Sequence, residues 1–218
     1  MFKKFPKFSQ LLDNKSIREF CKYIIVHKGN FVCTDTHHLT WVNVHGLLSV
    51  LDNLENTDIV EAAVWLEGKV FHYDDLVKIE KAKTLTICED CVIVDGLRME
   101  YKYTYSKVKG YFGSKLRVSD GNGEGFDYPN YLDVIPSIDT YNEGLSKTCL
   151  DVSYITKFAA LKPVSNMFTN IFVPNSVSRG TILQHVSENY PNYKASMYLM
   201  PVLNHDNSLD LSILDNEL

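Results

Sequence analysis

Two cysteines separated by two residues form the most recognisable chemical motif in the sequence. Cys88 and Cys91 enclose two acidic residues, and a CxxC pair can bind zinc or form a redox disulfide. Zinc would need two more ligands, and Cys21 and Cys33 do not supply a second pair of that spacing. Because the surrounding residues favour strands, the sequence indicates a hairpin turn with free thiols rather than a metal or redox site.

The stretch Thr34–His38 brings one carboxylate and two imidazoles together. A metal site is one interpretation, but neighbouring His37 and His38 would face opposite sides of a strand. The alternative is a hairpin turn in which Asp35 and Thr36 hydrogen-bond to nearby backbone. We favour the turn.

Three glycines at 121, 123 and 125 resemble a phosphate-binding loop only in composition. The lysine and the helix that follow such a loop are missing, so a connector is the favoured interpretation. No spacing of serine, histidine and acid selects a catalytic group. The sequence therefore predicts a protein that is not an enzyme and needs no cofactor or metal.

Composition narrows the class of protein further. The 218 residues carry a formal charge of −5, which excludes a wholly basic nucleic-acid binder but allows a basic face on an acidic body. Five cysteines and a first stretch without a secretory apolar segment lead us to expect a cytoplasmic protein. No apolar run is long enough to span a membrane, so no membrane partner is expected.

Strand-forming and helix-forming patterns together predict an α+β fold. Helices are expected over 73–81 and 152–161, with a weaker one over 44–53. Strands are expected over 17–26, 31–35, 38–44, 84–88, 91–95, 98–105, 165–173, 181–186 and 193–203. Turns of the 84–105 meander are expected at Glu89-Asp90 and Gly96-Leu97. Each of the two stronger helices precedes three antiparallel strands, which suggests repetition of one unit.

Lysines gather on the two expected helices. The first carries Lys78 and Lys81, with Lys83 just beyond, and the second carries Lys157 and Lys162. Residues three apart share a helix face. One such helix is normally an ordinary solvated face, whereas two similar basic helices favour a common cationic surface.

Three segments together resemble the bacterial β sliding clamp, the ring that holds DNA polymerase on its template. They are Ile17–Val26 with Thr34–Leu39, the segment YPNYLDVIP at 128–136, and Tyr198–Leu203. Their order along the chain is that of the family. The chain departs from it in its short length, in Thr36 where a small residue is usual, and in His38 where a basic residue is usual.

The resemblance implies a DNA-clamp fold of antiparallel sheets with short helices on one face. Two clamp-like domains are expected, at 1–118 and 128–206, joined by a connector at 119–127 and followed by an acidic tail at 207–218. The second is short for a complete domain of the family. The resemblance further implies a processivity factor, here a shortened member of phage type, that encircles double-stranded DNA without reading its sequence. A homo-oligomer is expected, with a trimer favoured because two domains per copy then give a six-domain ring.

The resemblance also implies the binding residues. A hydrophobic pocket for peptides of the polymerase and clamp loader would comprise Cys21, Thr34, His37, His38, Leu39, Pro136, Met200, Pro201, Val202 and Leu203. The DNA-facing residues would be Lys78, Lys81, Lys83, Lys157 and Lys162.

Several alternatives stay open. Residues 208–213 loosely resemble the peptides that clamp pockets accept, so the tail could dock into a pocket or could simply be a disordered acidic tail. The chain could be a clamp-fold adaptor or decoy that binds a host clamp, polymerase or loader without forming a ring. A small enzyme or redox protein using the cysteines and histidines is the remaining rival.

Overall fold

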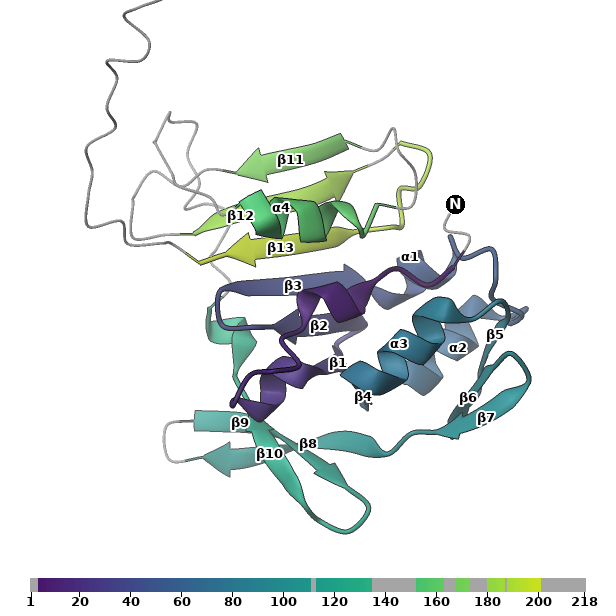
Figure 1. Cartoon of the computed structure of the whole chain (residues 1–218), viewed down its shortest axis with the longest axis horizontal. Coiled ribbons are helices and arrows are strands. Elements are labelled where there is room, and N and C mark those ends of the chain that lie inside the picture. The colour runs from purple at the N-terminus through teal and green to yellow at the C-terminus, as the bar shows by residue number, and fades with distance from the viewer. Residues whose placement is uncertain are drawn as a thin grey trace, which may run out of the picture.

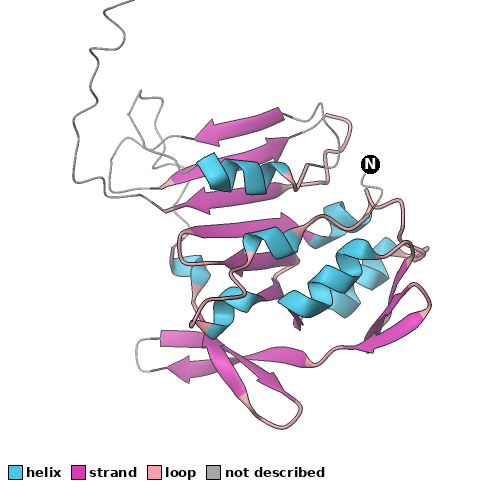
Figure 2. Ribbon diagram, in the orientation of Figure 1, coloured by secondary structure: helices cyan, strands magenta, loops and turns pink. Residues whose placement is uncertain are grey.

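The computed structural model describes residues 4–110, 113–134, 152–162, 168–172, 180–186 and 188–200. Most of the strands form one ten-stranded antiparallel sheet in the order β10-β9-β8-β4-β1-β2-β3-β13-β12-β11, and β5-β6-β7 form a second, small sheet. The helices lie on one face of the large sheet (Figures 1 and 2). The α+β class predicted from sequence is confirmed.

All paired strands of both sheets are antiparallel, as expected. Their bounds are β1 Tyr23–His27, β2 Asn30–Thr34, β3 His38–Asn43, β4 Lys69–His72, β5 Leu85–Ile87, β6 Cys91–Val94, β7 Leu97–Glu100, β8 Tyr103–Gly110, β9 Gly113–Asp120, β10 Gly125–Tyr128, β11 Phe168–Phe172, β12 Thr181–Val186 and β13 Ala195–Leu199. The helices are α1 Val44–Leu48, α2 Ile59–Leu66, α3 Tyr73–Lys81 and α4 Val152–Ala159, with 3₁₀ turns η1 Phe8–Leu11, η2 Glu19–Lys22 and η3 Tyr131–Asp133.

The central strands are buried on both faces. Along β1, Ile24 and Val26 join the core under the helices, whereas Tyr23 and Ile25 join a second core on the opposite face. This division follows from the two-residue period of a strand. The end of the sheet that holds β10 packs against this second core. There the Tyr128 hydroxyl of β10 donates a hydrogen bond to the Val32 carbonyl of β2.

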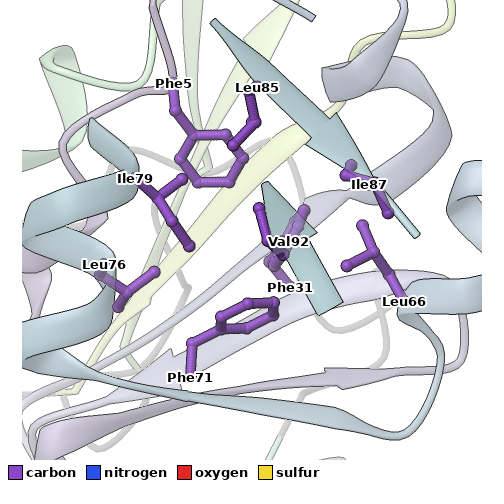
Figure 3. A pocket seen from close by; sticks show the side chains of 9 residues that line it. All are labelled: Phe5, Phe31, Leu66, Phe71, Leu76, Ile79, Leu85, Ile87 and Val92. Carbon is purple, nitrogen blue, oxygen red and sulfur yellow. The ribbon is translucent and has the colours of Figure 1, made fainter. Parts of the chain in front are cut away.

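The helix-side core unites the two halves of the chain. Leu76 and Ile79 of α3, Leu11 of η1 and Phe158 of α4 all belong to one apolar cluster, and η1 contacts both α3 and α4. Figure 3 shows the part of this core beneath α3 and the small sheet, where only apolar side chains line a residual cavity of about 10 Å³. A gap of that size and polarity holds no ligand and stays dry.

Several sequence predictions are confirmed at the level of single elements. Helix α3 has the predicted bounds, α4 ends two residues early, and the expected 44–53 helix is the shorter α1. The meander is also confirmed, but its second turn is Asp95-Gly96 rather than Gly96-Leu97. Both residues have positive φ, and the Asp95 carboxylate accepts bonds from the amides of Lys83 and Thr84 at 2.7 and 2.9 Å, which fixes the turn there.

Other predictions were wrong. The expected strand 17–26 begins only at Tyr23, because its first part turns as η2, where the Cys21 amide bonds to the Arg18 carbonyl. The expected strand 98–105 is split between the two sheets at Tyr101–Lys102.

Residues 119–127 are not a free connector: Ser119 and Asp127 lie in the β9–β10 hairpin. The Asp120 carboxylate accepts from the amides of Asn122 and Glu124, which closes its turn. The division into two clamp-like domains stays a prediction, and one sheet runs across it.

The two halves of the chain approach most closely at a glycine. A Cβ added to Gly46 of α1 would lie 1.9 Å from the Asn192 carbonyl oxygen, just before β13. Gly46 is therefore required by packing, although a glycine lowers helix propensity.

We expect Gly46→Ala to destabilise the protein by about 1–3 kcal/mol, because the methyl group forces α1 away from the chain before β13. Chemical denaturation measures the change. Gly121→Ala is the matched control, since its Cβ would meet nothing within 4 Å, and it should change stability by less than about 0.5 kcal/mol. Equal stability of the two variants would contradict the close packing of the halves.

Candidate functional site

The Thr34–His38 turn is held by its own side chains. The Asp35 Oδ1 atom accepts from the amides of His37 and His38 at 3.0 and 3.1 Å. The Thr34 hydroxyl donates to the His38 carbonyl at 2.5 Å and accepts from the Thr36 amide at 3.2 Å. The turn predicted from sequence is therefore confirmed. Thr36 has φ = +80°, a strained conformation for a β-branched residue, which explains why a small residue would suit this position.

The second oxygen of Asp35 reaches the other half of the chain. Its Oδ2 atom accepts from the Tyr154 hydroxyl of α4 at 2.9 Å and lies 3.9 Å from Lys157 Nζ. Lys157 Nζ also lies 4.5 Å from the centroid of the Tyr154 ring. The Asp35 side chain is only 7% exposed, so the pairing is partly shielded from water. One carboxylate thus shapes the turn and anchors α4.

His38 is a structural residue. It is fully buried, its Nε2 atom donates to the Leu11 carbonyl at 2.9 Å, and its Nδ1 atom accepts from the Thr40 hydroxyl at 3.1 Å. The carbonyl can only accept, so the hydrogen lies on Nε2. Burial lowers the pKa of His38, with a weaker opposing effect from the Asp35 charge. Both ring nitrogens are therefore occupied, and His38 binds the N-terminal segment to the sheet.

His185 on β12 repeats this arrangement. Its Nε2 atom donates to the Phe158 carbonyl in α4 at 2.8 Å, and its Nδ1 atom lies 3.1 Å from the Thr169 hydroxyl. The ring stacks on that of Phe158 with 3.9 Å between centroids. Burial lowers the pKa of His185 to about 4. In both halves, a neutral buried histidine thus fastens a helical segment to the sheet.

Strand pairing brings together part of the expected peptide pocket. Leu39 pairs with Tyr198, and the Met200 amide donates to the His37 carbonyl at 2.9 Å. Leu39 and Met200 belong to the core on the face away from the helices, whereas His38 bonds to the helix side. Cys21, Thr34, His38 and Leu39 are buried, His37 is exposed and Met200 is partly exposed. Pro136, Pro201, Val202 and Leu203 lie outside the described residues.

The YPNY segment anchors the end of the first half. Tyr128 bonds to β2 as described above, and the Tyr131 hydroxyl lies 2.8 Å from His27 Nδ1. An open pocket of about 340 Å³ adjoins this segment, between Phe20 and Pro129. The tyrosines of the motif therefore position the chain that leads toward Pro136.

A second pocket lies on the helix side of the turn. It has a volume of about 390 Å³ and lies between the N-terminal segment, the Asp35 turn and α4, with Arg18, Asp35, His37 and Lys157 among its lining residues. It is polar and carries charges of both signs, so it is unlike the apolar peptide pocket implied by the resemblance. Asp35 and His38 are committed to structural hydrogen bonds, which leaves neither of them as a general base here.

The five expected DNA-facing lysines lie on α3, on α4 or just beyond their ends, and both helices cover the same face of the sheet. Lys78, Lys81 and Lys83 are exposed, and Lys157 and Lys162 are half-buried. Lys78 Nζ lies 3.4 Å from Asp75, one turn earlier. Lys78 is thus paired with Asp75 as Lys157 is with Asp35, and Lys81 and Lys83, at and just beyond the end of α3, carry the more accessible charge.

Sequence reasoning missed the cations of the N-terminal segment. Lys4 and Lys7 are exposed beside α3, where Lys4 Nζ donates to the Lys81 carbonyl at 3.2 Å. Glu80 fixes the segment by accepting from both the amide and the hydroxyl of Ser9 at 2.6 Å. The lysines near the start of the chain could have indicated this positive charge.

The CxxC motif is confirmed as a hairpin turn. The Cys88 amide donates to the Cys91 carbonyl at 2.9 Å between β5 and β6. Cys91 is buried, and burial together with its neighbours Asp90 and Cys88 raises its pKa to about 11, which keeps it a thiol. In the described part of the chain no group of three His, Cys, Asp or Glu residues is arranged to hold a metal ion.

Acid should weaken the protein through His185. Its pKa is lower when folded than in the unfolded chain, so the stability present above about pH 6.5 is lost as the pH falls toward 4. Relative to His185→Gln, wild type should lose about 2 kcal/mol of unfolding free energy between pH 7 and 4.5. Denaturation at the two pH values measures it, and an unchanged difference would contradict a neutral buried imidazole.

Asp35→Ala should cost about 2 kcal/mol, because two backbone amides and the Tyr154 hydroxyl lose their acceptor. Asp35→Asn is the matched control, since its carbonyl oxygen still accepts from the two backbone amides, whereas an NH2 group replaces the oxygen that accepts from Tyr154. The unfolding free energies of both variants give the comparison. A harmless alanine substitution would show that the turn does not depend on this carboxylate.

None of the helices in the described part of the chain is long and apolar enough to cross a membrane. A scan against protein-family models and a search of curated proteins find no match to this chain.

Proposed function

We propose that this chain is a sliding-clamp-like processivity factor, which encircles duplex DNA as a homo-oligomer and binds peptides of replication proteins. The observation that carries the proposal is the continuous sheet. β3 of the first half pairs with β13 of the second over five residue pairs, and α3, η1 and α4 share one face of the result. An antiparallel sheet that carries its helices on one face is the arrangement that a ring around DNA requires.

Repetition of one structural unit supports the same function. The turn η1 precedes β1-β2-β3, α3 precedes β5-β6-β7, and α4 precedes β11-β12-β13, with each set of strands antiparallel. A ring is naturally built from repeats of a helix with three strands, because each repeat presents the same face to the centre.

The charge distribution fits sliding rather than sequence reading. The exposed cations of α3 and the neighbouring Lys4 and Lys7 lie on the helix face of an otherwise acidic protein. Lysines attract phosphates without contacting base edges, so they hold the duplex but do not fix its position. In this proposal Lys81 contributes more than Lys78 and Lys157, which are paired with Asp75 and Asp35.

The ends of the sheet offer the means of closing a ring. In the described part of the chain, β10 and β11 are its two edge strands, and Ile171 on β11 is 54% exposed. Edge strands readily pair with another chain, and head-to-tail pairing that closes gives cyclic symmetry. Met200, which is partly exposed and belongs to the same apolar cluster as Leu39, would form part of the peptide-binding surface.

The mass in solution tests the assembly. Light scattering over a range of concentrations should report a trimer that dissociates on dilution, and the trimer should be retained on circular but not on linear DNA. A monomer at every concentration would reject the ring and favour the adaptor or decoy, which needs no closed assembly.

The double variant Lys78→Glu with Lys81→Glu should lower processive DNA synthesis about tenfold or more, because it reverses two accessible charges on the helix face. Primer extension on a long template measures product length per binding event. The control is Lys15→Glu with Lys194→Glu, two exposed lysines elsewhere, which should leave processivity intact. Equal processivity of the two double variants would remove α3 from the DNA-facing role.

A further inference from the structure

The β8–β9 hairpin extends beyond the body of the sheet. β8 pairs with β4 only at Tyr103 and Thr104, whereas it pairs with β9 along its whole length to Gly110 and Gly113. On the other side, β10 pairs with β9 only from Leu116 to Ser119. The outer part of the hairpin is therefore a two-stranded ribbon, which lies at the end of the sheet opposite β11 (Figure 1). We call the described residues of this ribbon, 105–110 and 113–117, the basic arm.

This arm has an unusual charge for its surroundings. The stretch 101–119 contains five basic residues and no acidic ones, within a chain whose formal charge is −5. The five are Lys102, Lys107, Lys109, Lys115 and Arg117. Such segregation of charge indicates an anionic partner rather than a general solvated surface.

Lys102 lies just before the arm and 4.0 Å from Asp75, and the four cations of the arm itself divide into two sets. Lys115 and Arg117 share one carboxylate, that of Asp127 of β10, at 3.1 and 3.2 Å. Lys107 and Lys109 are exposed and form no ion pair with any residue in the part of the chain that the structure describes. Because they lie two residues apart on one strand, they share a face and are spaced about 6.8 Å apart.

We propose that the basic arm binds the phosphate backbone of DNA, as a site separate from the helix face. Two cations repeated along a ribbon match successive phosphates of a strand, and a two-stranded ribbon is narrow enough to follow a groove of the duplex. The arm reads no sequence, since lysine contacts to phosphate carry no base information. This site requires no ring, so the proposal does not rest on encirclement.

The test uses the full chain and a short linear fluorescent duplex, from which any ring can slide off. Anisotropy titrations at several salt concentrations give the affinity and its salt dependence. Lys107→Glu with Lys109→Glu should weaken binding at least about tenfold. The corresponding double Gln variant should lower the slope of log affinity against log salt by about 2.

Two matched double variants complete the experiment. Lys15→Glu with Lys194→Glu carries the same change in net charge and should bind within about threefold of wild type, which excludes a general charge effect. Thermal melting of each variant shows whether it is folded. The second, Lys78→Glu with Lys81→Glu, is measured by processive synthesis on a long template rather than by duplex affinity, so failure of the helix face and failure of the arm give different results.

Three outcomes would overturn the proposal. Wild-type affinity of the folded arm variants would exclude a role in DNA binding, and so would the absence of duplex binding by wild type at low salt. Displacement of the duplex by an equal concentration of a peptide of residues 207–218 would show that the arm binds the acidic tail of the chain instead of DNA.

Discussion

The pairing of β3 with β13 is the interaction on which the rest of the structure depends. Ala195–Leu199 add to the edge formed by His38–Val42, and this ladder joins segments more than 150 residues apart in sequence. It makes one sheet of the two halves and places α4 beside η1. Without it, Asp35 would lose Tyr154 and Lys157, and Leu39 would lose Met200. The helix face and the turn site are both products of this one ladder.

A second set of contacts fixes the N-terminal segment between the helices. Glu80 holds Ser9 from α3, and the buried imidazole of His38 holds Leu11 from the sheet. The segment therefore covers the apolar face of the sheet between α3 and α4, as a longer helix would. Its exposed side bears Lys4 and Lys7, so a packing element also adds positive charge to that face.

The sequence predicted the elements whose signals are local. Acidic residues at the start of α3, its apolar spacing and the alternation of β12 gave both elements within a residue of their observed bounds. The Thr34–His38 turn was also predictable, because Asp35 and Thr34 satisfy it themselves. The basic arm was not recognised, because the sequence does not show that the hairpin with Lys107 and Lys109 extends beyond the sheet. Nor could the burial of Cys21 and His38 be foreseen, because it depends on the distant segments that cover them.

The late position of β13 has a consequence for biosynthesis. While the chain is being made, β3 is complete long before Ala195–Leu199 have left the ribosome, and its free backbone groups must wait for their partner. Unpaired edges of this kind attract other chains, and contacts between distant segments form slowly. Nascent copies translated side by side from one message are therefore exposed to mispairing during this interval, which makes the speed of translation a determinant of yield.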